Sequence, residues 1–271
     1  MKIKNLASTP FDEVLASFLA AFKNYFVELP TDKSYWEKRF INARVDWELS
    51  YGMFDGEKLV GYIISAVDNH LGYLTAYNTG TGVLTEYRGR GIVDNLYEHA
   101  LPLLKERGIE KCLLEVICEN ERAIKVYERI GFRSTRSLRS FTGTIPEVPS
   151  ENTLQKCHFS QAIESGLYKS KHYSWDNTAE AVVMMSEEVQ TWCIGNKISP
   201  DAYLVIDKTG NILQLESKDD NYERLLGSAA VIAKDVKLKN VDSERTELIK
   251  TLQKWHFLNP VNQYEMEMFI V

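Results

Sequence analysis

The sequence is poor in features that mark metal, redox and membrane proteins. It has four cysteines, Cys112, Cys118, Cys157 and Cys193, and no two of them have the C-x-x-C spacing of a zinc or redox site. No apolar run approaches the ~18 residues that span a bilayer. The first ten residues have no apolar stretch after their lysines, unlike a signal peptide. We therefore expect a cytoplasmic protein with free thiols, no membrane segment and no metal.

The chain also lacks an excess of basic residues. Lys and Arg number 32 against 38 Asp and Glu, which gives a formal net charge of −6 at pH 7. Binding to nucleic acid depends on clustered cations that neutralise phosphates, so we expect no nucleic-acid partner. Hydrophobic residues make up 44% and charged residues 26% of the 271 residues, which is typical of a globular protein with a core.

The pattern of apolar and turn residues predicts a mixed α/β domain over residues 1–145. Helical spacing of apolar residues predicts a helix over 11–27, and the Asp55-Gly56 turn predicts a hairpin. The expected elements are, in order, strand 2–6, helix 11–27, a helix after Pro30, strands 47–54, 59–67 and 74–85, helix 92–107, strand 111–117, helix 123–130 and strand 137–145.

A glycine loop lies between a predicted strand and a predicted amphipathic helix. Its sequence is Glu86-Tyr87-Arg88-Gly89-Arg90-Gly91-Ile92. A helix N-terminus offers unpaired N–H groups and about half a positive charge, which suit a pyrophosphate. Gly89 and Gly91 permit a close approach, and Arg88 and Arg90 can supply charge-assisted contacts. The alternative is that the two glycines only make a tight turn.

This loop resembles motif A of the GCN5-related N-acetyltransferases (GNAT). Arg88 and Gly91 fit the signature, and Val93 lies where a small residue is usual. The resemblance implies an acyl-CoA N-acyltransferase-like fold and acetyl-CoA as co-substrate. The pyrophosphate contacts that it implies are Arg88, Gly89, Arg90, Gly91, Ile92 and Val93. The strand edge at Val83, Leu84 and Thr85 would pair with the pantetheine arm.

A second pattern, Asn120-x-x-Ala123-x-x-x-Tyr127-x-x-x-Gly131-Phe132, matches motif B of the same family. The resemblance implies that Tyr127 donates a proton to the departing thiolate, a role that its ordinary pKa of about 10 allows. Packing of Tyr127 in the core is the alternative. Asn120 suits a helix N-cap, a contact to the pantetheine arm, or both.

The base that accepts the amine proton is not evident. Glu115 is the leading candidate because it interrupts an apolar strand, where a carboxylate needs a partner or a purpose. A structural ion pair is the alternative for Glu115, and His70 and His99 remain possible bases. The aromatic residues Tyr25, Phe26, Tyr35 and Trp36 either wall the acceptor site, as the family's layout implies, or pack in the core.

Residues 146–271 are expected to form a second, smaller α+β lobe. A hairpin is predicted around 207–211, a helix over 243–257 and a strand over 264–271. One register aligns Ile124, Lys125 and Phe132 with Ile249, Lys250 and Phe257. The lobe is either a degenerate GNAT-like half or an unrelated fold. If it is a copy, it has lost the glycine loop and the tyrosine.

Together the two motifs predict an N-acetyltransferase that transfers an acetyl group directly to a primary amine. A small-molecule acceptor is favoured over a peptide or protein amine. The protein is expected to act as a monomer or homodimer. The alternative is a non-catalytic acyl-CoA sensor or interaction module, which would bind the cofactor without turning it over.

Overall fold

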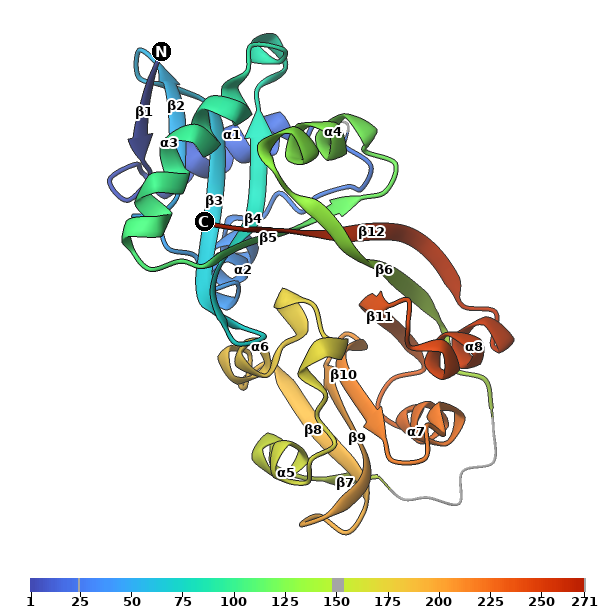
Figure 1. Cartoon of the computed structure of the whole chain (residues 1–271). Helices are drawn as coiled ribbons and strands as arrows, with labels where there is room; N and C mark the ends of the chain where they lie inside the picture. Colours follow the sequence, from blue (N-terminus) through green and yellow to red (C-terminus); the bar gives the residue numbers. More distant parts are fainter. Residues whose placement is uncertain (24, 148–153, 271) are drawn as a thin grey trace. The chain divides into compact units, whose positions relative to one another are not determined.

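The computed structural model describes residues 1–23, 25–147 and 154–270, and it divides the chain into two compact units (Figure 1). The first unit is Met1–Thr135 together with Tyr264–Val271, and the second is Arg136–Gln263. The sequence predicts the boundary between the two domains at residue 145, and residues 148–153 just after it lie outside the described part. In the structure the first segment of the first unit ends at Thr135, inside β6 (Arg133–Thr144), so this strand begins in the first unit and continues in the second.

The first unit is a mixed sheet with helices on both faces. Its strands lie in the order β1-β2-β3-β4-β5-β12, and the β4–β5 pair is parallel. Its elements are β1 (Lys2–Asn5), α1 (Phe11–Ala21), α2 (Lys33–Asn42), β2 (Tyr51–Asp55), β3 (Lys58–His70), β4 (Tyr73–Val83), a 3₁₀ turn (Thr85–Tyr87), α3 (Ile92–Glu106), β5 (Lys111–Ile117), α4 (Glu121–Ile130) and the end of β12 (Leu258–Phe269). Helix α3 continues through Pro102, where the sequence predicted a kink.

Neighbouring residues of β3 show which helices cover which face. The Cα of Gly61 faces the side chain of Ile92 on α3, whereas the ring of Tyr62 stacks on Phe18 of α1 at 5.8 Å. Successive residues of a strand point to opposite faces, so α1 and α3 lie on opposite sides of the sheet (Figure 1). Helix α4 lies on the α3 side, because Tyr127 packs edge-on against Tyr97.

The parallel pair β4–β5 separates before either strand ends. Pairing runs from Thr75 opposite Lys111 to Asn78 opposite Leu114. Strand β4 then continues to Val83 and β5 to Ile117. An extra residue in β4 shifts its register against β3 between Asn78 and Gly80, as a β-bulge does. The sheet therefore opens between the carboxyl ends of two parallel strands, where ligands bind in many α/β proteins.

The second unit repeats this order of elements. Its sheet has the order β6-β11-β10-β9-β8-β7, and β10 and β11 are parallel. Its elements are β7 (Gln155–Lys156), α5 (Phe159–Glu164), 3₁₀ turns (Ser170–His172 and Trp175–Asn177), α6 (Ala179–Met184), β8 (Val189–Gly195), β9 (Pro200–Asp207), β10 (Asn211–Ser217), α7 (Tyr222–Ala229), β11 (Asp235–Asp242) and α8 (Thr246–Lys254).

Backbone hydrogen bonds place α4 and α8 in one register, 125 residues apart. Phe132 N–H donates to Tyr127 O and Phe257 N–H donates to Leu252 O, both at 3.0 Å. The residue before each phenylalanine has a positive φ, 122° at Gly131 and 57° at His256. Asn120 therefore corresponds to Arg245 at the start of the helix. This is the register that the sequence suggested, and it describes an internal repeat.

Candidate functional site

The glycine loop places an uncapped helix end beside the opened strands. Gly91 is the N-cap of α3 with φ of 69°, and Gly89 has φ of 79°; both values favour glycine. No side chain caps the helix, and its first internal bond joins Asn95 N–H to Gly91 O at 3.0 Å. The N–H groups of the first turn are therefore not bound by a capping side chain, and the anion site that the sequence predicts at this helix end stays a prediction.

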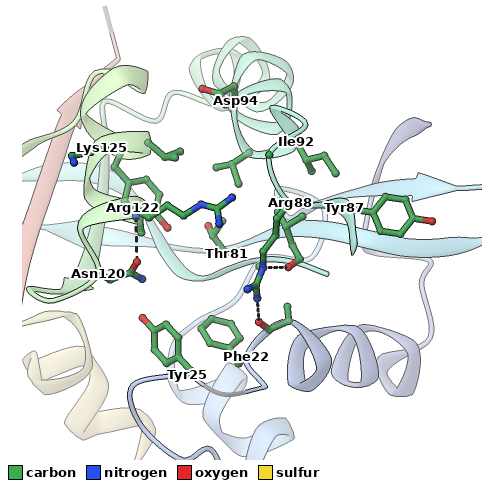
Figure 2. Close-up of a pocket in the computed structure, with 18 of the residues that line it drawn as sticks. Phe22, Tyr25, Thr81, Tyr87, Arg88, Ile92, Asp94, Asn120, Arg122 and Lys125 are labelled. Carbon is green, nitrogen blue, oxygen red and sulfur yellow. Dashed lines mark hydrogen bonds between the residues drawn. The ribbon is translucent and has the colours of Figure 1, made fainter. Parts of the chain in front are cut away.

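A cavity of about 910 Å³ adjoins this helix end. Four parts of the first unit line it: the end of α1 and the segment after it, β4 beyond its split from β5, the glycine loop, and the first two turns of α4 (Figure 2). Of the residues predicted for the site, the lining includes Val83, Arg88, Gly89, Gly91, Ile92, Val93, Asn120 and Tyr127.

Four predicted residues do not line the cavity. Leu84 is buried, and its N–H donates to Val60 O at 2.9 Å. Thr85 begins the 3₁₀ turn that follows. Of the predicted segment Val83–Thr85, only Val83 therefore belongs to the cavity lining, together with Thr81 and Gly82 before it. Arg90 and Glu115 also lie outside the lining.

The side chains of both loop arginines donate hydrogen bonds to backbone carbonyl oxygens of the protein. Arg88 donates from Nε to Val83 O at 3.1 Å and from Nη2 to Ala21 O at 2.8 Å (Figure 2). Arg90 donates to Glu86 O at 2.9 Å, and its guanidinium lies 4.9 Å from the centre of the Tyr87 ring. Arg88 thus joins the end of α1 to the end of β4, which fixes the cavity wall.

Cationic side chains that sequence reasoning did not select come from α4. Figure 2 shows the Arg122 side chain extending into the cavity. Two other cations of the lining are already paired: Arg129 binds both carboxylate oxygens of Asp94 at 2.8 and 2.7 Å, and Lys125 lies 3.7 Å from Glu121. The signal was available, because Arg122 falls inside motif B, two residues after its asparagine.

Tyr127 is buried in the cavity wall on the α3 side of the sheet. Burial raises its pKa from 10.0 to about 12, and hydrogen bonding to Thr81 and Asn78 limits the rise in this pKa. The phenol is therefore protonated throughout the physiological range. Tyr127 packs in the core, which was one of its two predicted roles, and it also lines the cavity; proton donation, the other predicted role, stays a prediction.

Asn120 is both an N-cap and a cavity residue. Its Oδ1 accepts from Ala123 N–H at 3.2 Å, which caps α4. The side chain also hydrogen-bonds to Tyr25 across the cavity, and burial raises the pKa of that phenol. Phe22, Tyr25 and Phe26 pack edge to face along the same wall. The helix predicted over 11–27 ends at Ala21, so these rings belong to the wall.

Glu115 lies on the opposite face of the sheet from Tyr127. Leu114, which pairs with Asn78, points to the same face as Tyr97 of α3, so the next residue points to the α1 face. Glu115 directly follows the last paired residue of β5, where the strands begin to separate. The two predicted catalytic residues therefore flank the opening from its two sides.

The described residues show neither a metal cluster nor a membrane-spanning helix. Residues 1–23, 25–147 and 154–270 bring no three His, Cys, Asp or Glu side chains together as a metal site would require. Among the helices of those same ranges, none combines the length and apolar character that crossing a bilayer demands.

Comparison with known proteins agrees with the geometry. Residues 13–132 match the "Acetyltransferase (GNAT) family". This match lies within the first unit. A tandem GNAT protein from the clavulanic acid biosynthesis pathway has a TM-score of 0.69 and 13% identity, with 100% of this chain and 98% of that chain covered. At this identity the likeness shows the fold alone, that of a tandem GNAT protein.

Curated relatives match the chain only in part. N-alpha-acetyltransferase 30 of Schizosaccharomyces pombe is 36% identical over 86 residues, which are 31% of this chain and 57% of the relative. Mycothiol acetyltransferase of Corynebacterium glutamicum is 28% identical over 139 residues, 49% of this chain and 47% of the relative. The matches therefore span about half the length of these relatives.

Proposed function

We propose that the first unit is an N-acetyltransferase that moves an acetyl group from acetyl-CoA to a primary amine. The observation that carries the proposal is a 910 Å³ cavity in which an uncapped helix end meets two strands that separate. A long ligand with a phosphate group at one end and an amide-bearing arm at the other matches both features. The match of residues 13–132 to the GNAT family supports acetyl-CoA as that ligand.

The phosphate end of the cofactor is assigned to the glycine loop. Free N–H groups of Ile92 and Val93, with Gly91 before them, bind the pyrophosphate, and the helix dipole favours its charge. Arg122 supplies the cation that Arg88 and Arg90 were expected to supply. Asp94 does not repel the anion strongly, because Arg129 neutralises it.

The pantetheine arm is assigned to the open edge of β4. Beyond Asn78 this strand has left β5, so its backbone groups are available for an added strand. Asn120 lines the same channel and offers an amide to the arm. The thioester then lies at the separation of the strands, between the faces that hold Tyr127 and Glu115.

Transfer follows from this placement. The amine nitrogen attacks the thioester carbonyl carbon and forms a tetrahedral intermediate. The C–S bond then breaks, its electron pair goes to sulfur, and the thiolate takes the proton of Tyr127. Burial raises the pKa of a thiol as well as of a phenol; the buried Cys112 thiol has its pKa raised to about 12, so donor and acceptor remain matched. Glu115 accepts the amine proton, directly or through water.

The acceptor is a primary amine. One of the two relatives is named an N-alpha-acetyltransferase and the other a mycothiol acetyltransferase, so peptide amines and small-molecule amines both belong in the test. We favour a small molecule as the acceptor. Release of free thiol from acetyl-CoA should be measured with a panel of small amines and of peptides with free N-termini.

Measurement of turnover distinguishes the proposed enzyme from a non-catalytic acyl-CoA sensor. An enzyme releases thiol with at least one acceptor and loses this activity in Tyr127→Phe. Binding of acetyl-CoA without transfer to any amine in the panel would support the sensor, and absence of any cofactor binding would refute both.

A further inference from the structure

Polar side chains next to Tyr127 form a hydrogen-bond network in which donors and acceptors can be assigned. Asn78 Nδ2 donates to Thr81 Oγ1 at 2.6 Å and to the Tyr97 hydroxyl at 2.8 Å. Its Oδ1 accepts from Gly80 N–H at 3.0 Å. The Gly80 N–H can only donate, so it fixes which end of the Asn78 amide carries oxygen. Both hydrogens of the amide are then committed to the two hydroxyl oxygens.

The hydroxyl protons follow from this arrangement. Tyr97 is buried, and Asn78 donates to its hydroxyl. Asn78 also donates to Thr81 Oγ1, and interaction with Thr81 lowers the pKa of both Tyr97 and Tyr127. Because the Asn78 amide nitrogen can only donate, we assign the Tyr97 proton to Thr81 and the Thr81 proton to Tyr127. Figure 2 shows Thr81 on β4 among the side chains that line the cavity.

We infer that Thr81 is a positioning residue for the proposed transfer: it donates to the Tyr127 oxygen and so directs the Tyr127 proton into the cavity. The inference rests on the proposed function, since the proton has to reach the thiolate. The same hydrogen bond stabilises the tyrosinate that forms as the proton leaves. The ionisable groups around Tyr127 are the phenols of Tyr25, Tyr62 and Tyr97, and none of them carries a charge at neutral pH.

The test is Thr81→Val, which removes the hydroxyl and keeps the shape. We expect kcat to fall about five- to tenfold, as loss of one neutral hydrogen bond implies, with KM for acetyl-CoA unchanged. Thr81→Ser should restore kcat. In a Tyr127→Phe background, Thr81→Val should have no further effect, because the two residues act through one proton.

Two results would overturn this role. One is an equal fall in kcat from Thr81→Val with and without Tyr127, and the other is an unchanged kcat. If wild-type protein transfers acetyl groups and Tyr127→Phe is fully active, the proposed role of Tyr127 fails, and the role of Thr81 fails with it, although the proposed activity stands. Thermal unfolding of each variant shows whether the fold is kept.

A different observation concerns the second unit, where the matching strands also separate. Strands β10 and β11 pair only at Asn211 and Ile212, and β10 then continues to Ser217 with an extra residue against β9. In the first unit this opening borders the cavity. In the second unit Leu215 and Glu216, which lie past the split, are buried.

The side chain of Arg245 lies where β10 has separated from β11. Arg245 begins α8 where Asn120 begins α4, and its side chain is 4% exposed. Its Nη2 donates to Leu215 O at 2.6 Å and lies 3.3 Å from Glu216 Oε2. The guanidinium lies between the rings of Tyr173 and Tyr222, 5.6 and 5.5 Å from their centres. The β10 carbonyl is thus bound by a side chain of the protein.

We propose that Arg245 is a built-in occupant that closes the second cleft, so that each chain binds one acetyl-CoA. A buried guanidinium is stable only with its partners in place, and here the carboxylate, the carbonyl and two rings supply them. The count of one rests on the proposed function of the first unit.

Calorimetry of the full chain with acetyl-CoA tests the count. Wild type should bind one equivalent. Gly91→Asp puts a carboxylate at the phosphate position, in a conformation that aspartate tolerates, and should abolish binding; Gly91→Asn should retain one weakened site. Two equivalents in wild type, or residual binding in Gly91→Asp, would overturn the closed cleft. No binding by wild type would instead refute the proposed function, and the count with it.

Hydrogen exchange tests Arg245 itself. In wild type, acetyl-CoA should slow exchange in β4 and leave the amides of Leu215, Glu216 and Ser217 unchanged. The double variant Arg245→Met, Glu216→Gln avoids a lone buried charge and should exchange faster at those amides without ligand. Equal exchange rates at those amides in wild type and in the double variant would show that Arg245 does not protect this part of β10 from solvent.

Discussion

Replacing Arg122 by glutamine removes one charge from the cavity and little volume. Arg122 is exposed, lines the cavity and forms no hydrogen bond or ion pair with the described residues. A hydrogen bond to a charged group contributes about 1.5–3 kcal/mol, and the lower end applies because solvent screens an exposed side chain. We therefore expect the Kd for acetyl-CoA to rise about tenfold, with kcat unchanged because the contact is uniform along the reaction.

Lys125→Gln is the matched control. It removes a charge from the same helix, but Lys125 is exposed and lies 3.7 Å from Glu121, so its loss should weaken binding less. Calorimetry at low and high salt adds a second readout, since the difference between wild type and Arg122→Gln should shrink as salt screens the charge. Equal affinity of wild type and Arg122→Gln, or an equal effect of Lys125→Gln, would refute the assignment.

Other outcomes are expected from the same geometry. Tyr127→Phe should lower kcat about 100-fold or more and leave the Kd for acetyl-CoA nearly unchanged. Because burial raises the pKa of Tyr127 to about 12, the acid form persists below that pH, and wild-type kcat should show no decline between about pH 7 and pH 10; a fall there would contradict the assignment. Glu115→Gln should slow transfer most at low pH and recover as the acceptor amine loses its proton, seen in kcat/KM against pH. Gly82→Ala would press a methyl group against the Tyr62 hydroxyl and to 2.8 Å from the Ala21 Cβ, so thermal unfolding should show a loss of about 1–3 kcal/mol.

The cofactor loop was predictable because its requirements are local. Two glycines between a strand and an amphipathic helix identify a backbone that an anion can approach, and Gly89 and Gly91 have the positive φ values that this requires. The start of α4 was predictable for the same reason, since Asn120 caps the helix that motif B defines.

Other features depend on partners distant in sequence, which no local pattern reveals. Arg88 was assigned to phosphate, yet its acceptors are Ala21 O and Val83 O. The spacing of aromatic residues predicted a helix to residue 27, but the helix ends at Ala21 and the aromatic residues after it line the cavity. Arg245 was passed over because a helix-start arginine reads as a surface residue, and only the fold shows it buried.

The last strand of the first unit comes from a segment that follows the whole second unit in the sequence. Ile270 N–H donates to Glu110 O at 2.9 Å and Glu267 lies 3.4 Å from the buried Lys111 ammonium, so residues 264–270 supply the strand beside β5. During translation the first sheet therefore stays one strand short until the second unit has been made. A truncation before residue 264 would damage the first unit as well as the second.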